Sequence, residues 1–191
     1  MIKNKLHPVI LTVPKQFSEF PIRERVKGIS KLSRETLFIS AHLSHLKIKT
    51  LTQSSTGMPI PDKGVYWSVS HKPEYVCGVV SRDKIGIDIE EIRPQQQSMY
   101  SYVASENEWD IIKGMRSKQS FFRCWTAKEA VLKTVGTGIV DLLKCYVIED
   151  LGDNGMILDY HDRHWLVEHY FFGNYIAAIL KDGVEILWHI I

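Results

Sequence analysis

The chain has 191 residues, of which 45% are hydrophobic and 24% charged, and its formal net charge is +2. These values are typical of an ordinary globular protein that forms one large domain or two small packed halves. The balanced charge excludes a histone-like electrostatic binder of nucleic acid, but it permits a local basic pocket for a phosphate-bearing ligand.

The cysteines and the apolar run near the N-terminus indicate the cellular compartment of the protein. Cys77, Cys124 and Cys145 are far apart and odd in number, which argues against both a metal clip and a disulfide framework. A reducing cytoplasm is therefore the expected setting. The apolar run between Pro8 and Pro14 is too short for a secretory signal, and no window approaches ~18 uninterrupted apolar residues. We expect no membrane span.

The first part of the chain is predicted to hold one helix among several strands. Its helix repeats apolar residues at close to helical spacing over 29–47, and a loop rich in Gly, Pro and Ser follows it. Strands are expected at 7–13, 65–70, 75–81 and 84–90. The segment "RDK" between the last two is read as a tight hairpin connection.

A polar run around Pro94 is predicted to be a linker between two parts of the chain. Helical stretches follow at 99–114 and 118–136, the second ended by Gly136 and Gly138. The tail is expected to form antiparallel strands at 144–150, 155–160, 164–172, 174–180 and 183–190. This order predicts an α+β fold in two halves of similar length, residues 1–94 and 95–191.

The strand "KIGIDIE" carries two acids on an otherwise apolar element. Its three isoleucines alternate with Gly86, Asp88 and Glu90, so the carboxylates share one face of the strand. A solvated strand face explains this pattern at least as well as a site, when the strand is considered alone.

The helix "CWTAKEAVLK" offers a second set of polar residues. Trp125, Glu129 and Lys133 fall at i, i+4 and i+8, hence on one helical face, and Lys128 borders that face. The simplest alternative is a surface Glu–Lys pair worth a few tenths of a kcal/mol, with Trp125 packed in the core.

Taken together, the strand and the helix indicate a metal site. Asp88, Glu90 and Glu129 would supply three hard oxygen ligands for one Mg²⁺, which keeps waters and shares its ligands with a substrate phosphate. Lys133 and Lys128 would contact phosphate oxygens. Such a site suits attack at phosphorus, where a metal ion and lysines neutralise charge on the oxygens.

The paired motifs "IGIDIE" and "CWTAKEAVLK" resemble the signature of the 4′-phosphopantetheinyl transferases, which is Gly-x-Asp-x-Glu followed by an aromatic residue, Lys-Glu-Ala and a later Lys. "WSVSHK" matches the family's Ser-His element at Ser70 and His71, and "SENEW" resembles its stretch with a further acid, here Glu108. "GMP" departs from the usual Gly-Lys-Pro, with Met58 in place of lysine. The resemblance is firm over about residues 57–138, and the chain length resembles the Sfp-type branch, an intramolecular pseudo-dimer of two similar α+β halves.

The resemblance implies an activity and a set of catalytic roles. The reaction would move the 4′-phosphopantetheine group from coenzyme A to a serine hydroxyl of an apo acyl or peptidyl carrier protein and release 3′,5′-ADP. Asp88, Glu90 and Glu129 would hold Mg²⁺, for which Mn²⁺ can substitute. Glu129 and Lys133 would act in catalysis, and Glu108 is the candidate general base, with a surface helix acid as its alternative.

The resemblance also implies residues that bind coenzyme A. His71, with Ser70, would bind one phosphate, and Lys133 and Lys128 would contact the pyrophosphate. Arg34 is the expected partner of the 3′-phosphate, and a solvated helix face is the equal alternative. Other basic residues stand behind it: Arg23, Arg25 and Lys49.

Two other functions remain open at this point. A Mg²⁺-dependent phosphohydrolase or nuclease would use the same acids but gives no reason for "SVSH". A non-enzymatic domain that binds coenzyme A or a carrier would need no Mg²⁺. Under the transferase hypothesis the partners are coenzyme A and a carrier protein that meets residues 91–103, with no nucleic acid and no membrane, and the protein is expected to be a cytoplasmic monomer.

Overall fold

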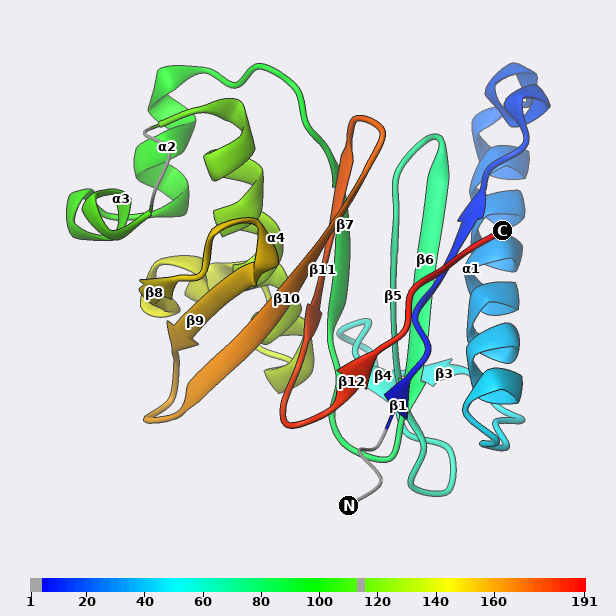
Figure 1. The fold of residues 1–191 in the computed structure, drawn as a ribbon. Coiled ribbons are helices and arrows are strands. Elements are labelled where there is room, and N and C mark those ends of the chain that lie inside the picture. Colours follow the sequence, from blue (N-terminus) through cyan, green and yellow to red (C-terminus); the bar gives the residue numbers. More distant parts are fainter. Residues whose placement is uncertain (1–4, 113–115) are drawn as a thin grey trace. The chain divides into compact units, whose positions relative to one another are not determined.

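The computed structural model describes residues 5–112 and 116–191 (Figure 1). Helices and several sheets are both present, which confirms the α+β prediction. The chain divides into two compact units, one that runs to Ile87 and takes in Gly183–Ile191, and one that spans Asp88–Asp182. These bounds differ from the predicted halves 1–94 and 95–191, because the last residues fold with the first unit. The pseudo-dimer stays a prediction.

The first unit is built on a four-stranded sheet in the order β13-β2-β6-β5. The two pairs made by β6 are antiparallel, whereas β13 runs parallel to β2. The strands are β2 (Val9–Thr12), β5 (Tyr66–His71), β6 (Tyr75–Ser81) and β13 (His189–Ile190). The remaining short elements are β1 (Lys5–Leu6), β3 (Thr52–Gln53), β4 (Pro59–Ile60), β12 (Glu185–Ile186) and the 3-10 helix η1 (Lys15–Glu19).

Helix α1 (Ile22–Leu43) lies along this sheet and packs against β6, β2 and β5 (Figure 1). Leu37 is fully buried in the interface. Gly78 allows the close approach, since a Cβ added there would lie 2.1 Å from Thr36 Oγ1. The helix begins at Ile22, before the predicted start at residue 29, and Pro21 with its extended backbone is its N-cap residue.

The second unit has a five-stranded sheet in the order β7-β11-β10-β9-β8, so β7 and β8 are its two edges. Its strands are β7 (Ile87–Glu91), β8 (Tyr146–Asp150), β9 (Gly155–Asp159), β10 (His164–Phe172) and β11 (Tyr175–Leu180). The longest helix of this unit, α4 (Lys118–Val135), packs across β9, β10 and β11. The other helices are α2 (Gln97–Val103), α3 (Glu106–Ile111) and the 3-10 turns η2 (Ile139–Lys144) and η3 (Gly152–Asn154).

Two expectations about strand pairing are wrong. The segment "RDK" does not close a hairpin, because β6 pairs with β2 and β5 while β7 joins the other sheet beside β11. The last segment does not extend the antiparallel sheet either. It forms the short strands β12 and β13, which run parallel to β1 and β2 in the first unit. Alternation of side chains predicts that a segment is a strand, but it does not identify the partner strand.

None of the helices in the described part of the chain is both long enough and apolar enough to cross a bilayer.

Candidate active site

Strand β7 presents Asp88 and Glu90 on one face, as its alternating sequence predicts. Ile87 and Ile89 are fully buried on one face. Asp88 points to the other face but is also enclosed, with 4% of its surface exposed, and Glu90 is half-buried. A solvated strand face is therefore not what the structure shows for Asp88. A carboxylate that is buried to this extent requires a charged or hydrogen-bonding partner.

Helix α4 places one narrow polar face within reach of that strand. The helix begins with a reciprocal cap between Ser117 and Ser120 and ends at Gly136, whose φ of 88° is left-handed. From Ser120 to Thr134, every residue is buried except Trp125, Glu129 and Lys133. Between Ser120 and Thr134, the three residues predicted to share a face by their i, i+4, i+8 spacing are thus the part of this helix that remains accessible.

Two contacts join the face of α4 to the acids of β7. Lys133 Nζ lies 2.6 Å from Asp88 Oδ1, and Trp125 Nε1 donates a hydrogen bond of 3.1 Å to Glu90 Oε1. Glu129 lies one helical turn from each of these helix residues, between the two contacts. Trp125, expected in the core, is half-buried and bonds to Glu90. The helix and the strand are therefore held together along the predicted site.

These residues fit a divalent cation by their chemistry. Carboxylate oxygens are the ligands that Mg²⁺ takes, and the Lys133 ammonium shows that a positive charge is accommodated beside Asp88. Among residues 5–112 and 116–191, no group of three or more histidine, cysteine or acidic side chains is already arranged around one ion.

Glu108 and Lys128 lie in the interior of the second unit and contact each other. Lys128 is fully buried, and its Nζ is 2.6 Å from Glu108 Oε1 and 2.8 Å from the Val103 carbonyl oxygen. The same Glu108 oxygen accepts from Val147 N at 3.0 Å, and Oε2 accepts from the Ser105 N–H and hydroxyl at 2.9 Å each. This carboxylate ties α3 and α4 to β8.

The candidate ligands of coenzyme A in the first unit occupy two places. His71 ends β5 and lines a groove of about 630 Å³ together with Arg25 and Lys72. Arg34 lines a different and much smaller pocket of about 70 Å³, beside Trp67. Ser70 is buried, on the opposite face of β5 from His71. Met58, 37% exposed, precedes β4.

The groove at His71 includes basic residues that the sequence pattern does not single out. Its basic residues are Arg25, Lys15 and Lys72, and its apolar lining includes Phe17 and Val26. The sequence favours Arg34 over Arg25 and singles out neither lysine. Lys72 directly follows His71 in "SVSHK", which was a usable signal. Lys15 reaches the groove only through the fold of η1 beside α1.

Comparison with known proteins identifies the family. Residues 84–180 match the sequence profile of the 4′-phosphopantetheinyl transferase superfamily, a stretch that contains β7 and α4. The chain is 35% identical over 86 residues to 4′-phosphopantetheinyl transferase gsp of Aneurinibacillus migulanus, covering 44% of this chain and 36% of the relative.

Two further relatives carry the same name. HetI of Nostoc sp. is 33% identical over 99 residues, covering 46% of this chain and 42% of the relative. Sfp of Bacillus subtilis strain 168 is 25% identical over 137 residues, covering 70% and 61%. The matched part of the chain thus spans between about a third and three-fifths of these relatives, and the matches to gsp and Sfp confirm the resemblance to the Sfp-type branch. The chain belongs to the 4′-phosphopantetheinyl transferase superfamily.

Proposed function

We propose that the protein transfers the 4′-phosphopantetheine group from coenzyme A to a serine hydroxyl of an apo acyl or peptidyl carrier protein and releases 3′,5′-ADP. The observation that carries the proposal is the paired contact of β7 with α4, Lys133 to Asp88 and Trp125 to Glu90, which brackets Glu129. Strand β7 and helix α4 carry the two halves of the family signature. The proposal therefore places the transfer reaction where the acids of β7 meet the Trp125–Glu129–Lys133 face of α4.

The acids of this face are proposed to hold Mg²⁺ or Mn²⁺. Asp88, Glu90 and Glu129 are the ligands in this proposal, because carboxylates are the oxygen donors that these hard cations prefer. When bound, the cation neutralises charge on the pyrophosphate of coenzyme A.

Two side chains of α4 are proposed to accept the serine proton and to stabilise the charge on the phosphate oxygens. Glu129 accepts the serine proton on the carboxylate oxygen that does not hold the cation, while the serine oxygen forms its bond to the phosphorus atom next to the pantetheine. The bond from that phosphorus to the bridging oxygen breaks, and the electron pair leaves on 3′,5′-ADP. Lys133 turns from Asp88 to the phosphate oxygens and stabilises their charge. Glu108 and Lys128 serve in this proposal as a buried ion pair rather than as general base and phosphate ligand, since each already has its partners inside the unit.

The groove at His71 is proposed to receive a phosphate of coenzyme A. Arg25, Lys15 and Lys72 share it with His71 and supply positive charge, while its apolar lining suits the adenosine. The position of Arg34 in a separate small pocket favours Arg25 as the phosphate partner of His71. Met58 supplies no charge at the position of the family's lysine, so the groove carries more of the phosphate binding in this proposal.

The proposed setting is the cytoplasm, with the protein acting as a monomer. Cys77, Cys124 and Cys145 are all buried thiols, which agrees with a reducing compartment. The monomer follows from the resemblance to the pseudo-dimeric branch.

The test is an assay with purified protein, coenzyme A, Mg²⁺ and an apo acyl carrier protein, read by mass spectrometry. The carrier is expected to gain one phosphopantetheine. Glu129→Gln keeps the shape and removes the charge, and it should lower the rate by at least about 100-fold, as expected for loss of a group that acts in the transition state. Glu149→Gln changes an exposed acid of β8 and serves as the matched control, with no change in rate.

The outcomes separate the competing functions. Release of inorganic phosphate without a gain on the carrier indicates a phosphohydrolase. No gain on any of several carriers contradicts the proposed transferase, and an undiminished rate in Glu129→Gln removes Glu129 from the reaction.

A further inference from the structure

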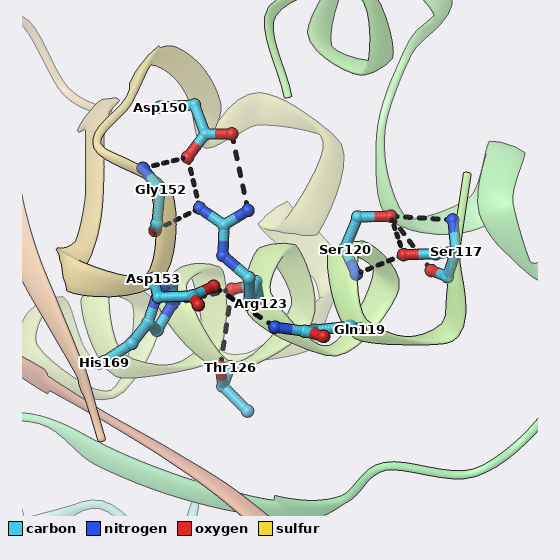
Figure 2. A network of polar contacts seen from close by, with 9 residues as sticks. All are labelled: Ser117, Gln119, Ser120, Arg123, Thr126, Asp150, Gly152, Asp153 and His169. Atoms are coloured by element: carbon cyan, nitrogen blue, oxygen red, sulfur yellow. Dashed lines mark hydrogen bonds and ion pairs between the residues drawn. The ribbon is translucent and has the colours of Figure 1, made fainter. Parts of the chain in front are cut away.

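Arg123 of α4 forms an ion pair that lies away from the site face of the helix. Figure 2 shows its side chain reaching Asp150, the last residue of β8. The guanidinium contacts both carboxylate oxygens, with Nη1 3.4 Å from Oδ2 and Nη2 on Oδ1, and Nη2 also donates to the Gly152 carbonyl oxygen. The Gly152 N–H group donates a hydrogen bond of 2.9 Å to Asp150 Oδ1. Arg123 and Asp150 are only 3% and 5% exposed.

A second strand holds the backbone of the same arginine. His169, on β10, has its Nε2 3.0 Å from the Arg123 carbonyl oxygen (Figure 2). A carbonyl oxygen accepts, so Nε2 carries the proton. Burial, and then the neighbouring Arg123 cation, lower the pKa of His169 to about 3, so the ring is neutral at physiological pH. Arg123 is thus tied by its side chain to β8 and η3 and by its backbone to β10.

These contacts lie at the opposite edge of the sheet from the candidate site. In the order β7-β11-β10-β9-β8, α4 packs across the three central strands. Trp125 and Lys133 bind the acids of β7 at one edge, and Arg123 binds Asp150 at the other. Arg123 precedes Trp125 by two residues, about 200° around the helix. The helix is therefore fixed at both edges of the same sheet.

Stability alone does not account for a buried ion pair at this place. Burying two charges costs free energy that their attraction only partly recovers, and well-packed apolar residues of similar size are often as stable or more so. Apolar contacts, however, do not define a direction, whereas a guanidinium with two carboxylate contacts does. A shift of α4 by one residue would move it by about 1.5 Å and 100° and would carry Glu129 away from β7.

We propose that Arg123 and Asp150 are positioning residues: their ion pair fixes the rotation and axial position of α4, so that Glu129 and Lys133 face the acids of β7. The kinetic consequence rests on the proposed function, because it concerns the rate of phosphopantetheine transfer. The placement of α4 against β7 does not depend on the proposed function. The Trp125 indole group reports this placement directly through its hydrogen bond to Glu90.

The test is the double variant Arg123→Met with Asp150→Leu, which replaces the pair by apolar side chains. The indole ¹H–¹⁵N resonance of Trp125 is assigned by its loss in Trp125→Phe. In the folded double variant this resonance should shift or broaden, and kcat should fall by about tenfold with an unchanged KM for coenzyme A, because small displacements of reacting groups are costly. The matched control is Arg163→Met with Asp182→Leu, which removes an exposed Arg–Asp pair and should change neither quantity.

Each outcome decides the proposal. An unchanged Trp125 resonance in the folded double variant overturns it, and so does a changed resonance with wild-type kcat. If the wild-type protein transfers nothing, the proposed function fails, and the resonance alone decides the positional inference. If the double variant does not fold, Arg123→Lys replaces it, since lysine keeps the charge and loses the paired N–H groups; an unchanged resonance there overturns the proposal.

Discussion

At the scale of single residues, the contact between Asp88 and Lys133 supports the candidate site. An aspartate that is 4% exposed and 2.6 Å from a lysine is a paired charge in the interior. The sequence predicted that Asp88, Glu90 and Glu129 belong together, because their spacing matches a known signature and because two regular periodicities place them on defined faces. It did not predict that Trp125 would bond to Glu90, since an indole group is equally suited to a core.

His169 is the residue with the clearest pH dependence. Its folded pKa is about 3 against an ordinary value of 6.5, so below pH 6.5 the unfolded chain takes up a proton that the folded chain does not. The stability associated with this neutral ring is complete above pH 6.5 and is lost as the pH falls towards 3. Between pH 7.5 and 5.5 the free energy of unfolding should drop by about 1.4 kcal/mol on this account.

His169→Gln should remove that part of the pH dependence, as measured by urea unfolding at the two pH values. His164→Gln changes a histidine whose side chain is 70% exposed and should keep the wild-type difference. An identical pH difference in His169→Gln and the wild-type protein would show that this ring does not titrate as described.

At the scale of elements, α4 is held by buried charges on several sides. Lys128 is enclosed completely and paired with Glu108, which in turn caps α3 and accepts from the β8 backbone. The burial of Lys128 could not be predicted from the sequence, because a lysine that borders a polar face is ordinarily solvated. Only the fold of α3 against α4 and β8 determines that it is buried.

Lys128→Met should therefore be strongly destabilising. The change leaves the Glu108 carboxylate buried without its counter-charge, at an expected cost of about 3–5 kcal/mol in the free energy of unfolding. Urea unfolding measures this cost. Lys144→Met removes an exposed lysine that pairs with the half-buried Asp141, and it should cost less than about 1 kcal/mol. Equal costs for the two variants would contradict the buried structural role of Lys128.

At the scale of the whole molecule, local patterns predicted the element types well and the pairing of strands poorly. Helix α4 and strands β8 to β11 follow from periodicity and turn residues. The parallel pairing of β12 and β13 with β1 and β2 could not be read from the sequence, because the partners lie at opposite ends of the chain. The assignment of His71 and Arg25 to one groove likewise depends on how α1 and η1 lie on the sheet.

The central claim is that the acids of β7 and α4 bind one divalent cation, and Mn²⁺ binding followed by electron paramagnetic resonance tests it most directly. In the presence of coenzyme A, the wild-type protein should bind one Mn²⁺ per chain. Glu129→Gln should weaken this binding by at least about tenfold, because a neutral amide replaces a carboxylate ligand, and Glu149→Gln should leave it unchanged. Equal Mn²⁺ affinity in the wild-type protein and Glu129→Gln would contradict the account.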